Sequence, residues 1–443
     1  MASLARSGAS DSDAASGSAG PRPHQGTLMR LPRTPVGSRL AAGLLIGSLF
    51  LSPAARADEP VPTAPAVTAK PSGQLLVRYR LHEGHDFASG GDRIFVTQRA
   101  RLGLRLDFGA AVGAFVQLQD VRVWGEEGDT LGDYSAAGLD LHQGYIDVGG
   151  PEGMTLRVGR QEIGYLNHRL IGNVGFVEQA RSFDAARLSY AADALTADLF
   201  YARTRDGADA DSAVATDVLA GFFQYRIDPA FVPALIAVVD ISGPAERTRV
   251  TAGLHATGAL DFGLSYSLEG YYQGGSAAGD VSYAAYLAAL HARYTLKSVG
   301  VKPFVELFAE LVSGDDDPAD ADVKTFDTLF ATNHKFYGEM DFFLNLPANT
   351  GGRGLMDLGA TLGAAPTDDV TVALTAHLFS AMDDQGGDGA FGTELDLKAT
   401  YKPFDHLALD LVYAVFLPGD GFTGGASNAD AEHFVYATMD ASF

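Results

Sequence analysis

Cysteine is absent from this chain of 443 residues. The chain therefore has no disulfides, thiol nucleophile, thiolate zinc site, iron–sulfur cluster or covalently attached haem. Positive charge is also scarce, because 32 Lys and Arg stand against 55 Asp and Glu, for a net charge of −23. A nucleic-acid-binding protein needs a net basic surface to neutralise phosphates, so this composition excludes that class. An anionic partner would have to meet a local basic patch.

Long apolar runs are missing except near the N-terminus. There, three arginines precede the apolar run 40–51, and the small-residue sequence Ala-Arg-Ala follows at 55–57. This order of features predicts a secretory signal peptide over residues 1–57, with Met29 as a candidate start of translation. The run is too short for a lasting membrane anchor, since a helical span needs about 20 apolar residues.

Residues 58–73 are rich in proline, which cannot donate to a sheet ladder. We predict that they form a periplasmic leader outside the folded part, residues 74–443. No apolar run in that part is long enough for a helical span. The exported protein is therefore either soluble or a membrane β-barrel.

Side chains alternate with a period of two along much of 74–443. In the stretch 94–108, apolar residues occupy one face, and Arg99, Arg101 and Arg105 occupy the other. A period of two indicates a strand with two different environments. Burying unpaired charges is costly, so the arginine face must be wet or densely paired.

Strand length favours a membrane barrel over a secreted sandwich or solenoid. The alternating runs are about ten residues long, which suits a tilted membrane crossing, and no repeat of 20 to 50 residues is evident. About 20 residues per strand and connection predict an all-β, transmembrane antiparallel β-barrel of roughly 18 strands (16–18). In the last predicted strand, apolar and other residues alternate up to the C-terminal Phe443. We expect the barrel assembly machinery to recognise this terminal aromatic residue. The expected location is the outer membrane of a Gram-negative bacterium, in contact with its lipid.

Arginine is concentrated in the first half of this wall. Residues 58–205 hold 15 Lys and Arg, 14 of them Arg, against 19 acids, whereas residues 206–443 hold 11 and 34. Guanidinium groups bind carboxylates in a bidentate manner, and successive weak sites favour conduction of anions. The alternation turns the following arginines inward: Arg78, Arg80, Arg99, Arg101, Arg105, Arg157 and Arg187.

The same arginines have a structural interpretation, which the sequence leaves open. They could pair with wall acids and brace the barrel, and the available acids are Asp107, Asp120, Asp147, Glu162 and Asp184. The acidic second half of the chain poses a further question. Its carboxylates would repel an acidic polymer if they faced the passage.

Several segments, taken in order, resemble the bacterial alginate export family. They are VQLQDVR (116–122), LHQGYID (141–147), VGRQE (158–162), RSFDAAR (181–187), TNHKFYGEMD (332–341) and GGRGLMDL (351–358). The resemblance implies an 18-stranded outer-membrane barrel with a basic constriction, through which an anionic polysaccharide leaves the cell.

By resemblance, the selectivity surface comprises Arg99, Arg101, Arg122, Arg157, Arg160 and Arg187, with Gln117, Gln119 and Asp120 binding sugar hydroxyls or orienting arginines. We therefore expect a passive channel for an anionic polysaccharide or small anionic solutes, with no cofactor. The alternatives are a general or sugar-acid uptake porin, a rim-active barrel enzyme and an adhesin-like barrel. The direction of transport and the oligomeric state stay open.

Other chemistry has weaker support in the sequence. The run 82–86 contains His and acidic residues, and the run 315–322 is rich in Asp, but neither has the spacing of a known metal site. We interpret both as solvated loops and leave Ca²⁺ binding by the second open. Neither a Gly-x-Ser-x-Gly nor a His-Glu-x-x-His sequence is present, so we expect no catalytic site.

Overall fold

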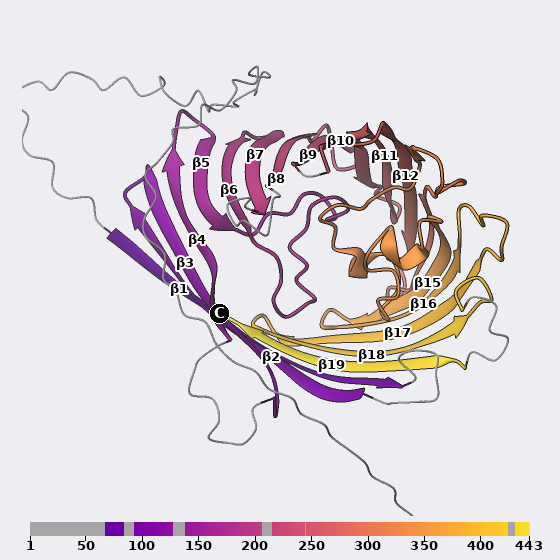
Figure 1. Ribbon diagram of the computed structural model, residues 1–443. Coiled ribbons are helices and arrows are strands. Elements are labelled where there is room, and N and C mark those ends of the chain that lie inside the picture. Colours follow the sequence, from indigo (N-terminus) through magenta and orange to yellow (C-terminus); the bar gives the residue numbers. More distant parts are fainter. Residues whose placement is uncertain (1–66, 84–92, 127–137, 206–214, 244, 424–429) are drawn as a thin grey trace, which may run out of the picture. The chain divides into compact units, whose positions relative to one another are not determined.

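The computed structural model describes residues 67–83, 93–126, 138–205, 215–243, 245–423 and 430–443. The predicted signal peptide therefore lies outside the described residues, as does most of the run 82–86. The described part is a sheet of long strands with two short 3-10 helices, η1 (Asn333–Lys335) and η2 (Ala348–Thr350) (Figure 1). No described helix is long and apolar enough to cross a membrane. The strands are β1 (Val67–Glu83), β2 (Arg93–Phe108), β3 (Val112–Val123), β4 (Leu139–Gly149), β5 (Met154–Gln161), β6 (Phe183–Ala191), β7 (Leu195–Arg205), β8 (Thr216–Tyr225), β9 (Val232–Ser242), β10 (Arg247–Ala259), β11 (Leu264–Ala277), β12 (Val281–Thr295), β13 (Phe304–Val312), β14 (Asp322–Val323), β15 (Leu355–Thr367), β16 (Val370–Ser380), β17 (Ala390–Phe404), β18 (Leu407–Pro418) and β19 (Glu432–Ser442).

The sheet closes into a barrel because β1 pairs with both β2 and β19. Each long strand is antiparallel to its neighbours, and β13 pairs directly with β15. The two-residue strand β14 pairs with the end of β12 in parallel and is not part of the wall. The barrel thus has 18 antiparallel strands, which confirms the predicted fold. Closure satisfies the edge groups that water cannot reach within a bilayer.

The predicted boundary between leader and barrel is wrong by seven residues. β1 begins at Val67, and its first seven residues pair with β2. Pairing with β19 begins at Gln74, and Gly73 exchanges backbone bonds with Phe443, so residues 67–72 have one free edge. Pro71 is tolerated there because the missing N–H can lie on the unpaired side.

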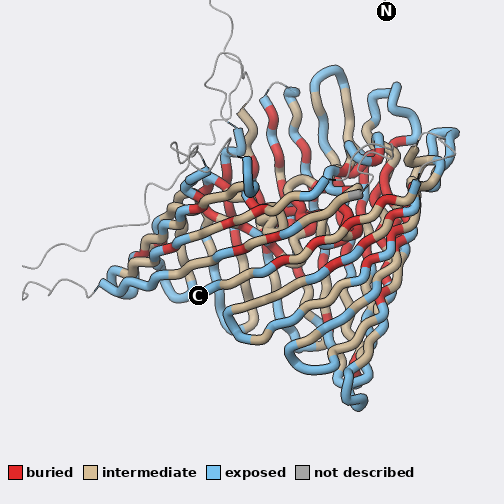
Figure 2. The backbone as a smooth tube through the Cα atoms, turned by 90° about the horizontal axis from the view of Figure 1, so that it is seen from below, coloured by how far each residue is buried: buried red, intermediate tan, exposed pale blue. Residues whose placement is uncertain are grey.

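The two faces of the wall differ as the alternation predicts. Leu75, Leu102 and Leu374 point outward and are exposed, whereas Arg78 and Arg99 point inward and are buried. Figure 2 shows the inclined strands, with buried residues concentrated toward one end of the barrel. The apolar outer face suits contact with lipid.

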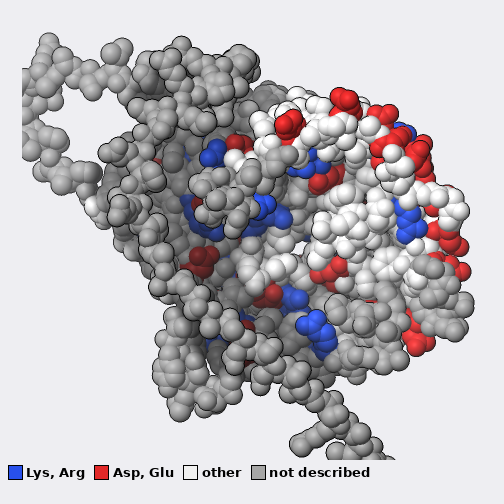
Figure 3. All heavy atoms as spheres, viewed as in Figure 1, with Lys and Arg blue, Asp and Glu red and all other residues white. Residues whose placement is uncertain are grey.

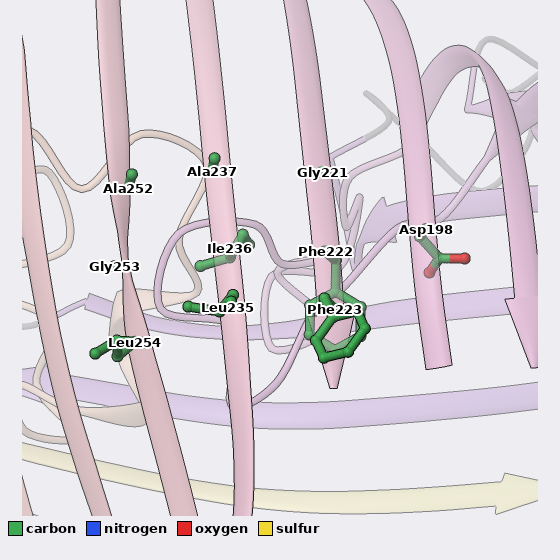
Figure 4. Close-up of a pocket in the computed structure, with 10 residues that line it drawn as sticks. All are labelled: Asp198, Gly221, Phe222, Phe223, Leu235, Ile236, Ala237, Ala252, Gly253 and Leu254. Atoms are coloured by element: carbon green, nitrogen blue, oxygen red, sulfur yellow. The ribbon is translucent and has the colours of Figure 1, made fainter. Parts of the chain in front are cut away.

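Small residues interrupt this outer face on β8 to β10. Gly221, Ala237 and Ala252 lie side by side across the three strands. They leave a shallow depression next to Leu235 and Leu254 (Figure 4). The depression belongs to the lipid-facing wall and not to the lumen.

The two ends of the barrel differ in the length of their connections. At the end that holds Val67 and Ser442, the turns are short, such as residues 109–111 and 405–406. At the opposite end, two connections are long among those that the structure describes throughout, residues 162–182 and 313–354. Outer-membrane barrels have short periplasmic turns and long extracellular loops, which assigns the second end to the outside. We call these connections the first and second inserted loops, because both fold into the barrel (Figure 1).

The outward face gives a direct stability prediction. Leu102→Lys places a charge in the lipid-facing wall near the middle of β2, so we expect a loss of about 2–4 kcal/mol of folding free energy. Gln117→Lys is the matched control, because Gln117 lies on the adjacent strand and faces the lumen. Denaturant unfolding in lipid vesicles measures both. Equal losses in the two variants would contradict the assignment of faces.

Candidate functional site

A sector of the inner wall, β1 to β6, carries basic side chains. Because directly opposed residues share a face, the pairings of these strands place seven arginines inward. Gln117 and Gln119 of β3 share this face, since they oppose Gly103 and Arg101. Figure 3 shows basic side chains in the hollow of the barrel. We call the inward arginines the basic sector: Arg78, Arg80, Arg99, Arg101, Arg105, Arg157 and Arg187.

Three of the predicted lumen residues point outward instead. Asp120 and Arg122 oppose Ala100 and Gln98, which belong to the lipid-facing side of β2, and they pair with each other at 2.7 Å. Arg160 opposes Gly144 and pairs with the exposed Asp184. Placing Asp120 on the face of Gln119 is wrong because neighbouring strand residues point to opposite faces. These three residues lie near the extracellular ends of their strands.

The three central arginines pair with three carboxylates, because Arg105 also donates to Asp107 at 2.8 Å. Asp147 accepts from both Arg157 Nε, at 2.7 Å, and Arg105 Nη1, at 2.5 Å. Arg157 and Arg187 stand directly opposite each other on β5 and β6, which like charges usually avoid. Asp198 accepts from Arg187 at 2.6 Å. The structural interpretation therefore holds in part, because each of these arginines has an acidic partner.

The guanidinium groups nevertheless face the lumen more than their partners do. The Arg187 side chain is 24% exposed and the Asp198 side chain 2%. For Arg157 and Asp147 the values are 28% and 10%. The carboxylates lie against the wall, and the cations extend over them. Water or solute in the lumen thus meets mainly the positive ends of these pairs.

Arg101 belongs to a polar network that the sequence did not reveal. It donates to Gln119 at 2.7 Å and lies 3.2 Å from Glu162. His142 is 2.6 Å from the same Glu162 oxygen, and Asn173 donates to the other oxygen at 2.9 Å. Burial alone would raise the pKa of Glu162, but the bonds from His142 and Asn173 and the charge of Arg101 lower it overall. His142 lies in the family-like segment LHQGYID, and no local pattern in the sequence indicates its partner.

The first inserted loop crosses the lumen and is anchored on the far wall by Arg169. β11 and β13 are separated from β6, which follows this loop, by at least β7 to β10, and β1 is separated from β13 by β15 to β19. Arg169 is buried and donates to Glu310 at 2.6 and 2.8 Å, and to Glu269 at 3.4 Å. Its guanidinium also lies 3.4 Å from the centre of the Phe336 ring, which belongs to the second inserted loop. One buried cation therefore ties both loops to the wall.

The other end of the same loop contacts the basic sector. Glu178 accepts from Arg78 and Arg80, each at 2.8 Å, and from Thr97 at 2.7 Å. Arg99 donates to three backbone carbonyls of the loop, including that of Gly175 at 3.1 Å. Burial would raise the pKa of Glu178, but the charges of Arg80 and Arg78 and the Thr97 bond outweigh it, and the pKa is lowered. The carboxylate is therefore ionised at neutral pH.

Apolar side chains of both loops pack against the inner wall of the barrel. The core joins Ile171, Phe336 and Phe343 of the loops to inward residues of β6 to β19, and no described residue of β1 to β5 belongs to it. Five inward acids of the later strands lie beneath this packing and are essentially inaccessible. They are Glu269, Glu310, Asp357, Glu394 and Asp396. The acidic second half thus does not present these carboxylates to solvent.

The aspartate-rich run in the second inserted loop is partly paired internally. Asp316 forms an ion pair with Lys324, and Asp315 accepts from the Lys324 backbone at 3.4 Å. Within the described ranges, no group of His, Asp or Glu has an arrangement that could hold a metal ion.

The closed barrel, its apolar outer face and its inserted loops define an outer-membrane channel of the porin class. The family model for alginate export matches residues 72–436. The chain belongs to the alginate export family, and its location is the outer membrane of a Gram-negative bacterium. No curated protein sequence matches it.

Solved structures with the same fold include porins of Pseudomonas aeruginosa. OccD3 (OpdP) has a TM-score of 0.54 at 13% identity, over 84% of this chain and 91% of that one. OccK8 (OprE) has a TM-score of 0.54 at 11% identity, over 85% and 98%. The outer membrane protein OpdK has a TM-score of 0.53 at 11% identity, over 84% and 98%. At these identities the likeness establishes the fold alone.

The Arg169 anchor predicts a large stability effect. Arg169→Met leaves Glu269 and Glu310 buried without this cation, so we expect a loss of about 3–5 kcal/mol and faster proteolysis within the first inserted loop. Arg160→Met removes an exposed outer pair and should cost less than about 1 kcal/mol. Denaturant unfolding and mapped proteolysis measure both effects. A wild-type proteolysis rate in Arg169→Met would refute the anchoring role.

The lowered pKa of Glu178 predicts acid release of the loop. Because the folded pKa is below the unfolded value of about 4.3, the stabilisation is complete above that value and is lost as the pH falls through the folded pKa. Hydrogen exchange of residues 173–181 should stay constant from pH 7 to 5 after correction for intrinsic rates, and rise in stronger acid. Glu178→Gln should lack this transition. A transition near pH 6 would instead implicate a histidine.

Proposed function

We propose that this protein is a passive channel selective for anions. The observation that carries the proposal is the geometry of the central ion pairs, in which Arg157 and Arg187 extend into the lumen over buried carboxylates. A positive surface of this kind raises the local concentration of anions and speeds their entry. Arginine keeps its charge at any physiological pH, so this selectivity should not depend on pH near neutrality.

We further propose an anionic polysaccharide as the physiological solute, which the family's description as alginate export supports. The basic sector extends from β1 to β6 and offers successive guanidinium groups instead of one tight site. Conduction needs such multiplicity, because a single strong site would retain the solute. Gln117 and Gln119 lie beside the arginines, where their amides are placed to bind sugar hydroxyls.

The packing of the inserted loops supports a path along the basic sector. Their apolar core occupies the side of β6 to β19, and it covers the five buried inward acids there. The polar network of Arg101, Gln119 and His142 lies outside that core. A polyanion following β1 to β5 would therefore avoid the carboxylates that would repel it.

A second candidate function is uptake of small sugar acids. The crossing of the bore by the first inserted loop favours it, because the loop divides the lumen into narrower spaces. Both candidates require anion selectivity, and they differ in the size of solute that passes. Blocking by oligouronates of increasing length separates them, since only a polymer channel should pass the longer chains.

Ion selectivity in a planar bilayer tests the anion selectivity that both candidate functions require. Under a KCl gradient we expect a reversal potential showing Cl⁻ more permeant than K⁺. The double variant Arg157→Gln, Arg187→Gln should lower the permeability ratio by about threefold or more, because it removes the most accessible opposed cations. Arg160→Gln has an outward side chain and should leave the ratio unchanged. Preference of the wild type for K⁺ would overturn the proposal.

A further inference from the structure

The part of the first inserted loop that touches the basic sector is a small closed loop, residues 173–181. The Arg181 backbone N–H donates to the Asn173 carbonyl at 2.7 Å and closes its base. Val174 and Ala180, next to that base, adopt left-handed φ angles of 49° and 55°. This conformation is unfavourable for residues other than glycine, above all for β-branched valine. Contacts elsewhere must therefore hold the segment in place.

The strongest of those contacts is a complete binding site for one carboxylate. Both oxygens of Glu178 are bonded, because Arg80 donates to the second one at 3.1 Å in addition to the bonds described above. Arg78 also stacks on the ring of Phe176, with its guanidinium carbon 4.0 Å from the ring centre. Two cations and one hydroxyl, Arg78, Arg80 and Thr97, thus converge on a single acid. We call these three residues the carboxylate seat.

We propose that Glu178 is an internal ligand, and that carboxylates of the permeating solute displace it from the carboxylate seat. The inference deepens the proposed function and rests on it, since it assumes that anions travel along the basic sector. Such an exchange conserves the charge-assisted hydrogen bonds, because one carboxylate replaces another. The seat stays occupied by Glu178 when no solute is present, and residues 173–181 yield it only to a competing carboxylate.

The exchange should depend steeply on the number of carboxylates in the solute. A tethered ligand competes at an effective concentration of about millimolar or more. A single uronate must therefore reach a comparable concentration to displace Glu178. A chain of uronates is held by neighbouring arginines while one of its carboxylates exchanges, so it succeeds at far lower concentration. Competition with Glu178 for the carboxylate seat thus discriminates polymers from monomers, although no site measures the length of the chain.

A cavity beside the seat provides a matched control residue. The cavity has a volume of about 260 Å³, and Arg78, Arg99, Tyr436 and Asp440 are among its lining residues. Asp440 lies on the inward face of β19 and accepts from Gln74 at 2.9 Å. Its substitution by Asn changes the lumen charge by the same amount as Glu178→Gln. It leaves the internal ligand in place.

Block of single-channel current by glucuronate and by trigalacturonate tests the proposal. In the wild type, trigalacturonate should block at a concentration at least about tenfold lower than glucuronate. In Glu178→Gln, the glucuronate concentration for half block should fall about tenfold, and the advantage of the trimer should shrink. Asp440→Asn should shift the glucuronate concentration for half block less than about twofold. Glu178→Asp, which keeps the charge on a shorter side chain, should give an intermediate shift.

Several results would overturn the internal-ligand proposal. Equal shifts in Glu178→Gln and Asp440→Asn would show a general effect of lumen charge instead of competition for the seat. An unchanged glucuronate affinity in Glu178→Gln would exclude competition altogether. If Glu178→Gln does not assemble, Glu178→Asp decides by the same comparison with Asp440→Asn. A wild-type channel that prefers K⁺ would defeat the proposed function itself, whereas an anion-selective wild type without these shifts defeats only this inference.

Discussion

The structure depends on how inward charges are satisfied in a wall that lipid surrounds. Closure of β1 on β19 satisfies the backbone, but it does nothing for the arginines and carboxylates that the alternation turns inside. Those charges need partners within the bore, and the partners come from neighbouring strands and from the inserted loops. Arg169 meets this requirement for Glu269 and Glu310, and Glu178 meets it for Arg78 and Arg80. The two ends of one loop thus carry opposite charges to opposite walls.

This arrangement separates the two halves of the lumen chemically. On the side of β6 to β19, loop side chains and wall residues form an apolar core over buried acids. On the side of β1 to β5, the lining stays polar, and the guanidinium groups of Arg105 and Arg157 extend over Asp147. A strongly acidic protein can in this way offer a basic surface to solutes. The net charge of −23 describes the whole chain and not the surface that a solute meets.

On the proposed function, stability and transport draw on the same ion pairs. A guanidinium fully enclosed with its acid, such as Arg169, mainly fixes the position of a loop. A guanidinium that is more exposed than its acidic partner, such as that of Arg187 beside Asp198, remains available to an anion. Arg78 lies between these cases, because it is buried by a loop segment that is itself conformationally strained. On the proposed function, anion selectivity depends more on how exposed each guanidinium group is than on the number of arginines.

The sequence by itself determined the barrel and the inward face of β1 and β2, because a two-residue period follows from the pleat of a strand. Chain length limited the strand number to about 16–18. The two-residue period places Asp120 and Arg122 on the face opposite to Gln119, outside the lumen to which the family resemblance assigned them. Only the tertiary structure decided which acid each arginine meets and where the inserted loops lie. Residues 162–182 and 313–354 have no such period, and Arg169 finds Glu310 across 141 positions of chain. Contacts of this range arise from closure of the whole barrel, which no local pattern of residues encodes.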